Sequence, residues 1–317
     1  MDKKRVIAYF NCIPPRNKNP EKPLILENYI KGVNAVGDEG IESRNSTVVH
    51  SDVAVIQGFV HEDSQNVPHL MLRKNVVETQ KRYGRRTVVV DSNLFLYKNP
   101  SNPGNYLRYS FDGVFPTTGE YCWDTPDPAR WQKISRDLNL KVKDWRKSGN
   151  HILICLQRNG GWSMKGNDVW QWLESTVKMI RQYSDRPIIV RGHPGDKKSA
   201  RAILRKQIPP HLLSLPNTYF SDMNAKSLDD DLRNCWATVV FNSSPAVASA
   251  IEGVPVFVFD PIDCQAGDVA NTNITQIESP DIFDRQSWLE KISMCHWNFE
   301  DLKSGACWSH MKKYVKA

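Results

Sequence analysis

The sequence predicts an α/β protein of two domains, each built on a parallel sheet with helices on both faces. Its 317 residues are enough for two domains of ordinary size. Short, continuous apolar runs recur along the chain, as is typical of buried parallel strands. Helical segments separate most of these runs, which is the alternation that parallel sheets require. A polar, glycine-containing stretch at residues 148–150 lies between two such series, so we expect domains over residues 1–148 and 149–317.

The individual elements follow from the same runs. In the first domain we expect strands at residues 6–10, 53–57 and 87–90 and helices at 24–36 and 68–83. Residues 99–145 show no single periodicity and are left unassigned. In the second domain we expect strands at 151–156, 187–190, 218–220, 238–241 and 255–259, and helices at 168–183, 198–206, 228–234 and 246–252. The segments 285–298 and 310–315 are predicted to be helical and to pack back on the first domain. We therefore expect two Rossmann-like domains that face a cleft.

Composition limits the classes of partner and compartment. No apolar run approaches the ~20 residues of a membrane span, and the run at 6–10 is too short for a signal peptide. Seven cysteines without a CxxC pair favour reduced thiols and a cytoplasmic protein, and Cys12, Cys155 and Cys235 lie in apolar segments where buried structural thiols are expected.

Charge is shared unevenly between the two halves. The net charge is +6 over residues 1–150 and +1 over residues 151–317. A basic first half suits a polyanionic partner, although a generally basic surface explains the charge as well.

The loops that follow the strands of the second domain carry the candidate binding residues, because ligands of open α/β sheets gather beyond the carboxyl ends of the strands. The loop "RNGGWSMKGND" at 158–168 follows the first of these strands. Its glycines free the backbone to approach a ligand, but an ordinary strand-to-helix turn has the same composition. The candidate residues in it are Arg158, Asn159, Gly160 and Gly161.

The segment "RGHPGDKK" at 191–198 ends the next strand on an imidazole and several cations. Pro194 stops the strand and leaves His193 at the carboxyl edge of the sheet. A lone histidine is usually structural, but with Arg191, Lys197 and Lys198 beside it, this one is placed to donate a hydrogen bond to a phosphate.

The stretch "FNSSPAVASAIEGVPVFVFD" at 241–260 is the most informative. Pro245 fits the first position of a helix of small residues, so Ser243 and Ser244 precede a helix N-terminus, where hydroxyls and free amides bind anions. An ordinary capped helix without a ligand has the same sequence pattern. Together with His193, these serines would hold two sides of one diphosphate. The acidic run at 229–231 is interpreted as a helix start capped by Ser227, with Asp230 three residues on, and not as a metal site.

These motifs resemble the donor half of GT-B glycosyltransferases, most closely the sialyl- and Kdo-type enzymes with HP and SS motifs. The longer pattern, "HILICLQRNGGWSM" with "SPAVASAIEGVPVFVFDPIDCQAGDVANTNITQIE", looks like glycosyltransferase-type proteins of large tailed phages, some of which add sugars, arabinose included, to hydroxymethylcytosine in phage DNA. The resemblance covers the C-terminal half well and the N-terminal half thinly.

The resemblance implies roles for particular residues. His193 would contact the donor phosphate and stabilise the departing nucleotide, Ser243 and Ser244 would bind the same phosphates, and the sugar or ribose would meet Gln265, Asp268 and Asn271. The HP/SS enzymes also carry an acidic-acidic-glycine motif whose carboxylate is the base. Residues 111–113, "FDG", offer Phe where the first acid is expected. Asp112 is the proposed base, with Asp91 and Glu62 as rivals.

The implied function is the transfer of a sugar from a nucleotide sugar, by default linked to UDP, to 5-hydroxymethylcytosine in double-stranded DNA. The reaction is expected to need no metal or other cofactor and no membrane. If the chain is phage-encoded, it is expected to act in the host cytoplasm. The residues predicted to track the DNA backbone are Arg82, Arg85, Arg86, Arg146 and Lys147. The aromatic side chains that could stack on a flipped base, or simply fill the core, are Tyr106, Tyr109, Phe111, Trp123 and Trp131. A transferase acting on a surface polysaccharide or small acceptor, and a non-catalytic nucleic-acid-binding protein, are the alternatives.

Overall fold

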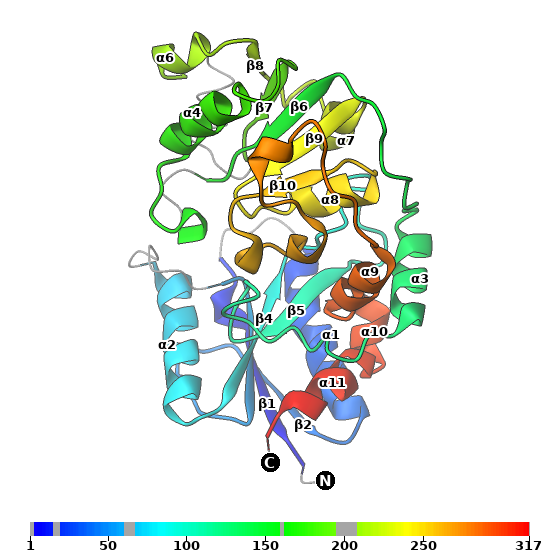
Figure 1. The fold of residues 1–317 in the computed structure, drawn as a ribbon. Helices are drawn as coiled ribbons and strands as arrows, with labels where there is room; N and C mark the ends of the chain where they lie inside the picture. The colour runs from blue at the N-terminus through cyan, green and yellow to red at the C-terminus, as the bar shows by residue number, and fades with distance from the viewer. Residues whose placement is uncertain (1–2, 15–19, 60–66, 159–161, 195–207, 317) are drawn as a thin grey trace. The chain divides into compact units, whose positions relative to one another are not determined.

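The computed structural model describes residues 3–14, 20–59, 67–158, 162–194 and 208–316 (Figure 1). The chain divides into two compact units. The first contains Met1–Asn93, Ser101–Lys133 and Glu290–Ala317, and the second contains Leu94–Pro100 and Ile134–Leu289. The division therefore falls inside helix α3 (Pro128–Asp137), earlier than the boundary expected at residue 148, and the last residues of the chain belong to the first unit.

The first unit is built on a six-stranded sheet in the order β11-β5-β4-β3-β1-β2. Its four parallel strands are β1 (Arg5–Tyr9), β2 (Glu39–Ser43), β3 (Val53–Gln57) and β4 (Arg86–Asp91). Strand β5 (Leu107–Phe111) runs antiparallel to β4, and β11 (His296–Trp297) runs antiparallel to β5. The parallel strands therefore all end at one edge of the sheet, whereas β5 ends at the other.

Helices cover both faces of this sheet. Figure 1 shows α2 (Pro68–Arg82) on one side, and α1 (Glu21–Ala35) with α10 (Phe299–Lys303) and α11 (Ala306–Met311) on the other. The core between them joins β-branched strand residues to aromatic side chains of α1 and α11, among them Tyr29 and Trp308. Burial of this apolar surface is what holds the helices against the sheet.

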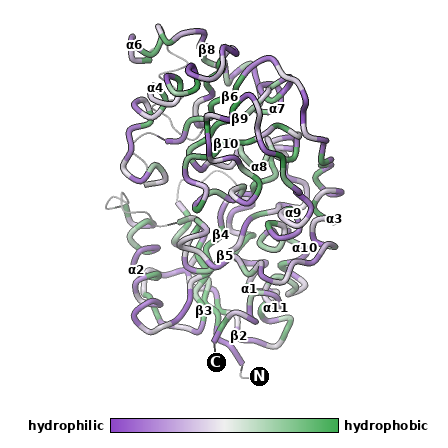
Figure 2. The backbone as a smooth tube through the Cα atoms, in the orientation of Figure 1, coloured by the Kyte–Doolittle hydropathy of each residue, from purple (hydrophilic) through white to green (hydrophobic). Residues whose placement is uncertain are grey.

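The second unit has a five-stranded sheet, entirely parallel, in the order β10-β9-β6-β7-β8. Its strands are β6 (His151–Cys155), β7 (Ile188–Arg191), β8 (Thr218–Phe220), β9 (Cys235–Val240) and β10 (Val256–Val258). The described helices that lie wholly in this unit are α4 (Val169–Ile180), α6 (Pro210–Leu213), α7 (Leu228–Leu232) and α8 (Pro245–Ile251), whereas α9 (Gln286–Ser293) is divided equally between the two units. Figure 2 shows hydrophobic segments gathered along the central strands. The α/β class and the parallel second sheet are as the sequence predicted, whereas the first sheet adds two antiparallel strands to its four parallel ones.

Several predicted elements differ from the structure. The segment predicted as one helix over 285–298 is helical only as α9, and residues 296–297 form strand β11 instead. The segment predicted as a helix over 310–315 is the end of α11 followed by a 3-10 turn over Lys312–Tyr314. The prediction missed β2 and β5, and the helix expected at 198–206 lies outside the described residues.

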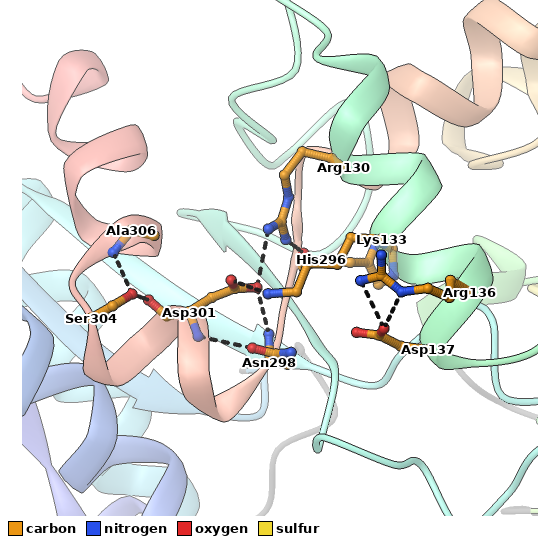
Figure 3. A network of polar contacts seen from close by, with 9 residues as sticks. All are labelled: Arg130, Lys133, Arg136, Asp137, His296, Asn298, Asp301, Ser304 and Ala306. Atoms are coloured by element: carbon orange, nitrogen blue, oxygen red, sulfur yellow. Dashed lines mark hydrogen bonds and ion pairs between the residues drawn. The ribbon is translucent and has the colours of Figure 1, made fainter.

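A buried ionic network fixes the turn that follows β11 (Figure 3). Asn298 and Asp301 cap the start of α10 reciprocally, through Asp301 N to Asn298 Oδ1 at 2.8 Å and Asn298 N to Asp301 Oδ2 at 3.3 Å. Asp301 also accepts hydrogen bonds from Arg130 at 3.0 Å and Lys133 at 2.7 Å, and Arg130 donates to the carbonyl of His296. The first half of α3 is thereby tied to the C-terminal segment of the same unit.

All seven cysteines are free and buried, as expected for Cys12, Cys155 and Cys235. Burial raises the pKa of every thiol, that of Cys12 to about 12, so these side chains behave as apolar packing groups. Within the described part of the chain, none of the helices is both long and apolar enough to cross a membrane.

Candidate functional site

The carboxyl edge of the second sheet brings the HP and SS segments together. Cys155 of β6 lies opposite Arg191 of β7 on one side and Val240 of β9 on the other. His193 follows two residues after Arg191, and Asn242 follows two residues after Val240. The HP and SS segments therefore both begin at the carboxyl edge, after the strands on either side of β6. That the two loops hold one ligand between them stays a prediction.

A polar network connects the loops at this edge. Gln157 Nε2 donates to Asn242 Oδ1 at 2.5 Å, and Asn242 Nδ2 donates to Asp260 Oδ2 at 2.9 Å. Lys165 Nζ lies 2.8 Å from Asp260 and 2.9 Å from Asp263, and these hydrogen bonds raise the pKa of Lys165. The loop after β6 is thus fixed to the loop after β10, with Asn242 between them.

Two buried polar atoms of this edge have no hydrogen-bond partner among the described residues: Gln157 Oε1 and Ser243 Oγ. Ser243 is 8% exposed and Gln157 is 5% exposed. Buried polar atoms are nearly always paired, so unpaired ones at a strand end indicate where a ligand atom would bind. Ser244 is exposed and makes no side-chain capping bond to α8, so the serines do not cap the helix in the ordinary way.

His193 is half-buried, two residues beyond the end of β7, and Arg158 is exposed directly after Gln157. Four other predicted donor-site residues, Asn159, Gly160, Gly161 and Lys197, lie outside the described residues, as does Lys198.

The structure corrects the prediction for Arg191. Its Nη1 lies 2.6 Å from the buried Asp231 Oδ2 and 3.0 Å from the carbonyl of Lys226. The guanidinium therefore holds the segment before α7 in place and does not point into the ligand edge. In the same segment, the predicted cap is confirmed: Ser227 and Asp230 form a capping box, with Asp230 N to Ser227 Oγ at 3.1 Å.

The loop after β10 supplies fewer ligand groups than expected. Asn271 uses its whole side chain on the backbone of Asp281, accepting from its N at 2.8 Å and donating to its O at 3.1 Å. The backbone of Asn271 also pairs with Phe257 as an extension of the sheet. Asn271 is thus a structural residue, which corrects the prediction. Gln265 is buried, and Asp268 is exposed.

The structure also argues against Asp112 as the catalytic base. Because β5 is antiparallel to β4, Asp112 lies where β4 begins, at the amino edge of the parallel strands. There its carboxylate accepts from Arg86 Nε and from the backbone amide of Thr87, both at 2.8 Å. Asp91 ends β4 at the carboxyl edge, with Arg108 Nη2 at 2.5 Å. The other rival, Glu62, lies outside the described residues.

The residues predicted to contact DNA do not form one free basic surface. Arg85 pairs with Asp52 at 3.0 Å, and Arg86 pairs with Asp112, at the amino edge of the first sheet. Arg82 is exposed at the end of α2. These positions lie away from the carboxyl ends of the parallel strands.

The other two predicted DNA contacts belong to the second unit, and one of them needs correction. Arg146 donates to the carbonyls of Leu232 at 2.6 Å and Cys235 at 2.8 Å, so it is committed to the protein's own backbone. Lys147 is exposed. Of the aromatic candidates, four are buried core residues: Tyr106, Tyr109, Phe111 and Trp131. Trp123 stacks on Tyr121 with ring centroids 4.6 Å apart.

Sequence reasoning missed the roles of Gln157, Asn242 and the Lys165–Asp260 pair. Gln157, Asn242 and Asp260 each come directly after an apolar run, and Lys165 lies within the quoted loop at 158–168. Their pairing across the edge depends on strand order, which the local sequence does not show.

The second sheet is parallel throughout, and the first has four parallel strands, β4, β3, β1 and β2. Two such sheets are typical of the GT-B class of fold. A solved structure described as Thermosulfurimonas dismutans KpsC, beta Kdo 2,7 transferase, is similar over 98% of this chain and 100% of its own, with a TM-score of 0.51 and 12% sequence identity. At that identity the likeness concerns the fold.

Two further solved structures resemble the chain less closely. The beta Kdo 2,4 transferase of T. dismutans KpsC matches with a TM-score of 0.47 and 12% identity, over 93% of this chain and 91% of that one. The S. aureus MnaA–UDP co-structure matches with a TM-score of 0.31 and 12% identity, over 98% of this chain and 97% of that one. No protein-family model matches the sequence, and no curated protein matches it.

Proposed function

We propose that the protein is a glycosyltransferase that binds a nucleotide sugar at the carboxyl edge of its second sheet. The observation that carries this proposal is the buried Ser243 Oγ in the loop after β9, which has no hydrogen-bond partner among the described residues. Strand β9 and strand β7, which leads to His193, lie on either side of β6. A phosphate oxygen would satisfy that hydroxyl. Loops that follow the strands on either side of one central strand suit a diphosphate held from two sides.

The chemistry follows from what these groups can donate. When the sugar is transferred, negative charge develops on the departing phosphate, and donors already in position lower the barrier most. The imidazole of His193 and the hydroxyls of Ser243 and Ser244 are such donors. Because they meet the charge with hydrogen bonds, the proposed transfer needs no metal or other cofactor.

For the base that takes the proton from the acceptor hydroxyl, we propose Asp91 in place of Asp112. Asp91 is one-third exposed and lies at the edge where the parallel strands of its sheet end. Both carboxylates pair with an arginine, so the choice depends on the edge: Asp91 lies where ligands of such sheets gather, and Asp112 lies at the opposite edge.

For the acceptor, two candidates follow from different observations. The resemblance and the basic first half favour 5-hydroxymethylcytosine in DNA. A cavity of about 540 Å³ at the carboxyl end of β1 and β2, lined by Phe10, Asn11, Arg44, Ser46 and His69 among others, favours a small saccharide acceptor. Its volume is that of a pocket for a small molecule.

One experiment tests the proposal. The protein is incubated with UDP-linked sugars and with activated Kdo, and with either hydroxymethylcytosine DNA or an oligosaccharide; nucleotide release and product mass are measured. We expect transfer to one acceptor, a loss of about 100-fold or more in His193→Ala, and unchanged transfer in His211→Ala, an exposed histidine of the same unit. Equal activity of the two variants, or no nucleotide release from any donor, overturns the proposal.

A further inference from the structure

A second cavity, of about 740 Å³, lies within the first unit and shares no residue with the donor edge. It is bounded by the end of α2, the start of β4, the turn after β5 and the C-terminal residues. Its charged lining consists of Lys81, Arg85, Arg86, Lys316, Asp52 and Asp112. Four cations thus face two carboxylates, and the cavity carries a net positive charge.

Both carboxylates are already occupied. Asp52 accepts from Arg85 at 3.0 Å and from the backbone amide of Arg5 at 2.8 Å. Asp112 accepts from Arg86 and from the amide of Thr87. They therefore orient the two arginines toward the cavity wall and have little capacity left to neutralise the lysines.

No ion pair joins Lys81 or Lys316 to a carboxylate of the described residues. Lys316 is held in position by its backbone, because its carbonyl accepts from Lys4 Nζ at 3.2 Å, and Arg86 Nη1 reaches the carbonyl of Tyr314 at 3.4 Å. The C-terminal residues are thus a fixed wall of the cavity, and the two ammonium groups are available to a ligand.

Most of the remaining side chains that line the cavity are apolar. Phe59, Val77 and Val315 line the cavity beside the cations. Arg86 is itself stacked over the Phe111 ring, 4.5 Å from its centroid, which fixes the plane of the guanidinium. The lysine ammonium groups beside it are compact cations of the kind that bind phosphate.

We propose that this cavity binds the phosphate ester of a nucleotide, either a free nucleotide or the phosphate of a nucleic-acid strand. Lys81 and Lys316 contact the phosphate, and the apolar wall receives the base or sugar. The volume lies within the range of small-molecule sites, so one nucleotide fills it. The site uses none of the donor-edge residues, so the proposal that it binds a nucleotide does not depend on the proposal of sugar transfer.

The test uses the full chain with His193→Ala and Ser243→Ala, so that the donor edge contributes no phosphate binding. Titrations with AMP and with a 12-nucleotide oligothymidylate are followed by calorimetry at low salt. We expect binding that weakens at least about tenfold in Lys81→Glu/Lys316→Glu, since each ammonium loses a charge-assisted hydrogen bond. Lys31→Glu, which reverses an exposed charge on α1 of the same unit, is the matched control and should bind as the parent does.

The two probes distinguish the sources of the phosphate. Tighter binding of AMP supports a free nucleotide as the ligand, and tighter binding of the oligonucleotide supports a strand. The absence of binding by either probe below about 1 mM, or an equal loss in Lys31→Glu, overturns the proposal. Circular dichroism of each variant confirms that a loss of binding is not a loss of folding.

Discussion

Replacing Ser243 by alanine should weaken nucleotide binding without destabilising the protein. The Ser243 hydroxyl is buried and has no partner among the described residues, and an unpaired buried polar group costs about 1–3 kcal/mol. Removing it takes that cost away and leaves a gap smaller than a methyl group. We therefore expect the free energy of unfolding to stay constant or rise by about 1 kcal/mol, which is a Tm increase of about 2–4 °C.

Nucleotide affinity should change in the opposite direction. A hydrogen bond to a charged phosphate contributes about 1.5–3 kcal/mol, so Ser243→Ala should raise the Kd for a nucleoside diphosphate about 10- to 100-fold. Differential scanning calorimetry and isothermal titration measure the two effects on the same samples.

Ser249 provides the matched control. Its hydroxyl lies 2.8 Å from the carbonyl of Pro245 and 2.9 Å from Thr238 Oγ1, so it is fully paired. Ser249→Ala should lower stability by about 1–2 kcal/mol and leave affinity unchanged. The reasoning is refuted if Ser243→Ala lowers stability as Ser249→Ala does, or if its nucleotide affinity equals that of the parent.

Three further predictions concern stability and the base. Gly253→Ala should lower stability by more than about 2 kcal/mol, because φ is +72° and the new Cβ would lie 2.0 Å from a backbone oxygen; an unchanged urea midpoint contradicts this. Asp301→Asn should cost about 3 kcal/mol, and Asp137→Asn, at an exposed pair, under about 1 kcal/mol. Burial alone would raise the pKa of Asp301, but Arg130 and Lys133 lower this pKa below its ordinary value of 3.8. The ionised carboxylate therefore stabilises the fold fully above pH 3.8, and this stabilisation is lost as the pH falls through the lowered pKa. Acid unfolding of Asp301→Asn should lack this loss. Asp91→Asn should lower kcat of sugar transfer about 100-fold, whereas Asp112→Asn changes it less than about twofold, and the reverse order would restore Asp112 as the base.

Local signals predicted the fold where apolar runs were continuous. The strands β6 and β9 are buried along their whole length and β7 at two of its four residues, and all three are continuous apolar runs that hydrophobicity alone identified. Strand β2, "EGIES", is a partly exposed edge strand with two acids, and β11 has only two residues that depend on β5 for pairing. Neither leaves a pattern in its own residues.

The predictions for the site also succeeded where the interacting residues are close in sequence and failed where they are distant. The Ser227 cap spans three residues and was predicted, because both partners lie within one turn. Arg191, Asn271 and Arg146 were misjudged because their partners lie 10 to 89 residues away. Asp112 was misplaced because the direction of β5 relative to β4 decides which edge it occupies, and that direction comes from the sheet.

A crystal structure of the protein with a nucleoside diphosphate bound decides whether the HP and SS loops form one phosphate site. We predict that phosphate oxygens lie within hydrogen-bond distance of both the His193 imidazole and Ser243 Oγ. A nucleotide bound elsewhere, with the Ser243 hydroxyl still unpaired, would contradict the proposed donor site and the transferase function built on it.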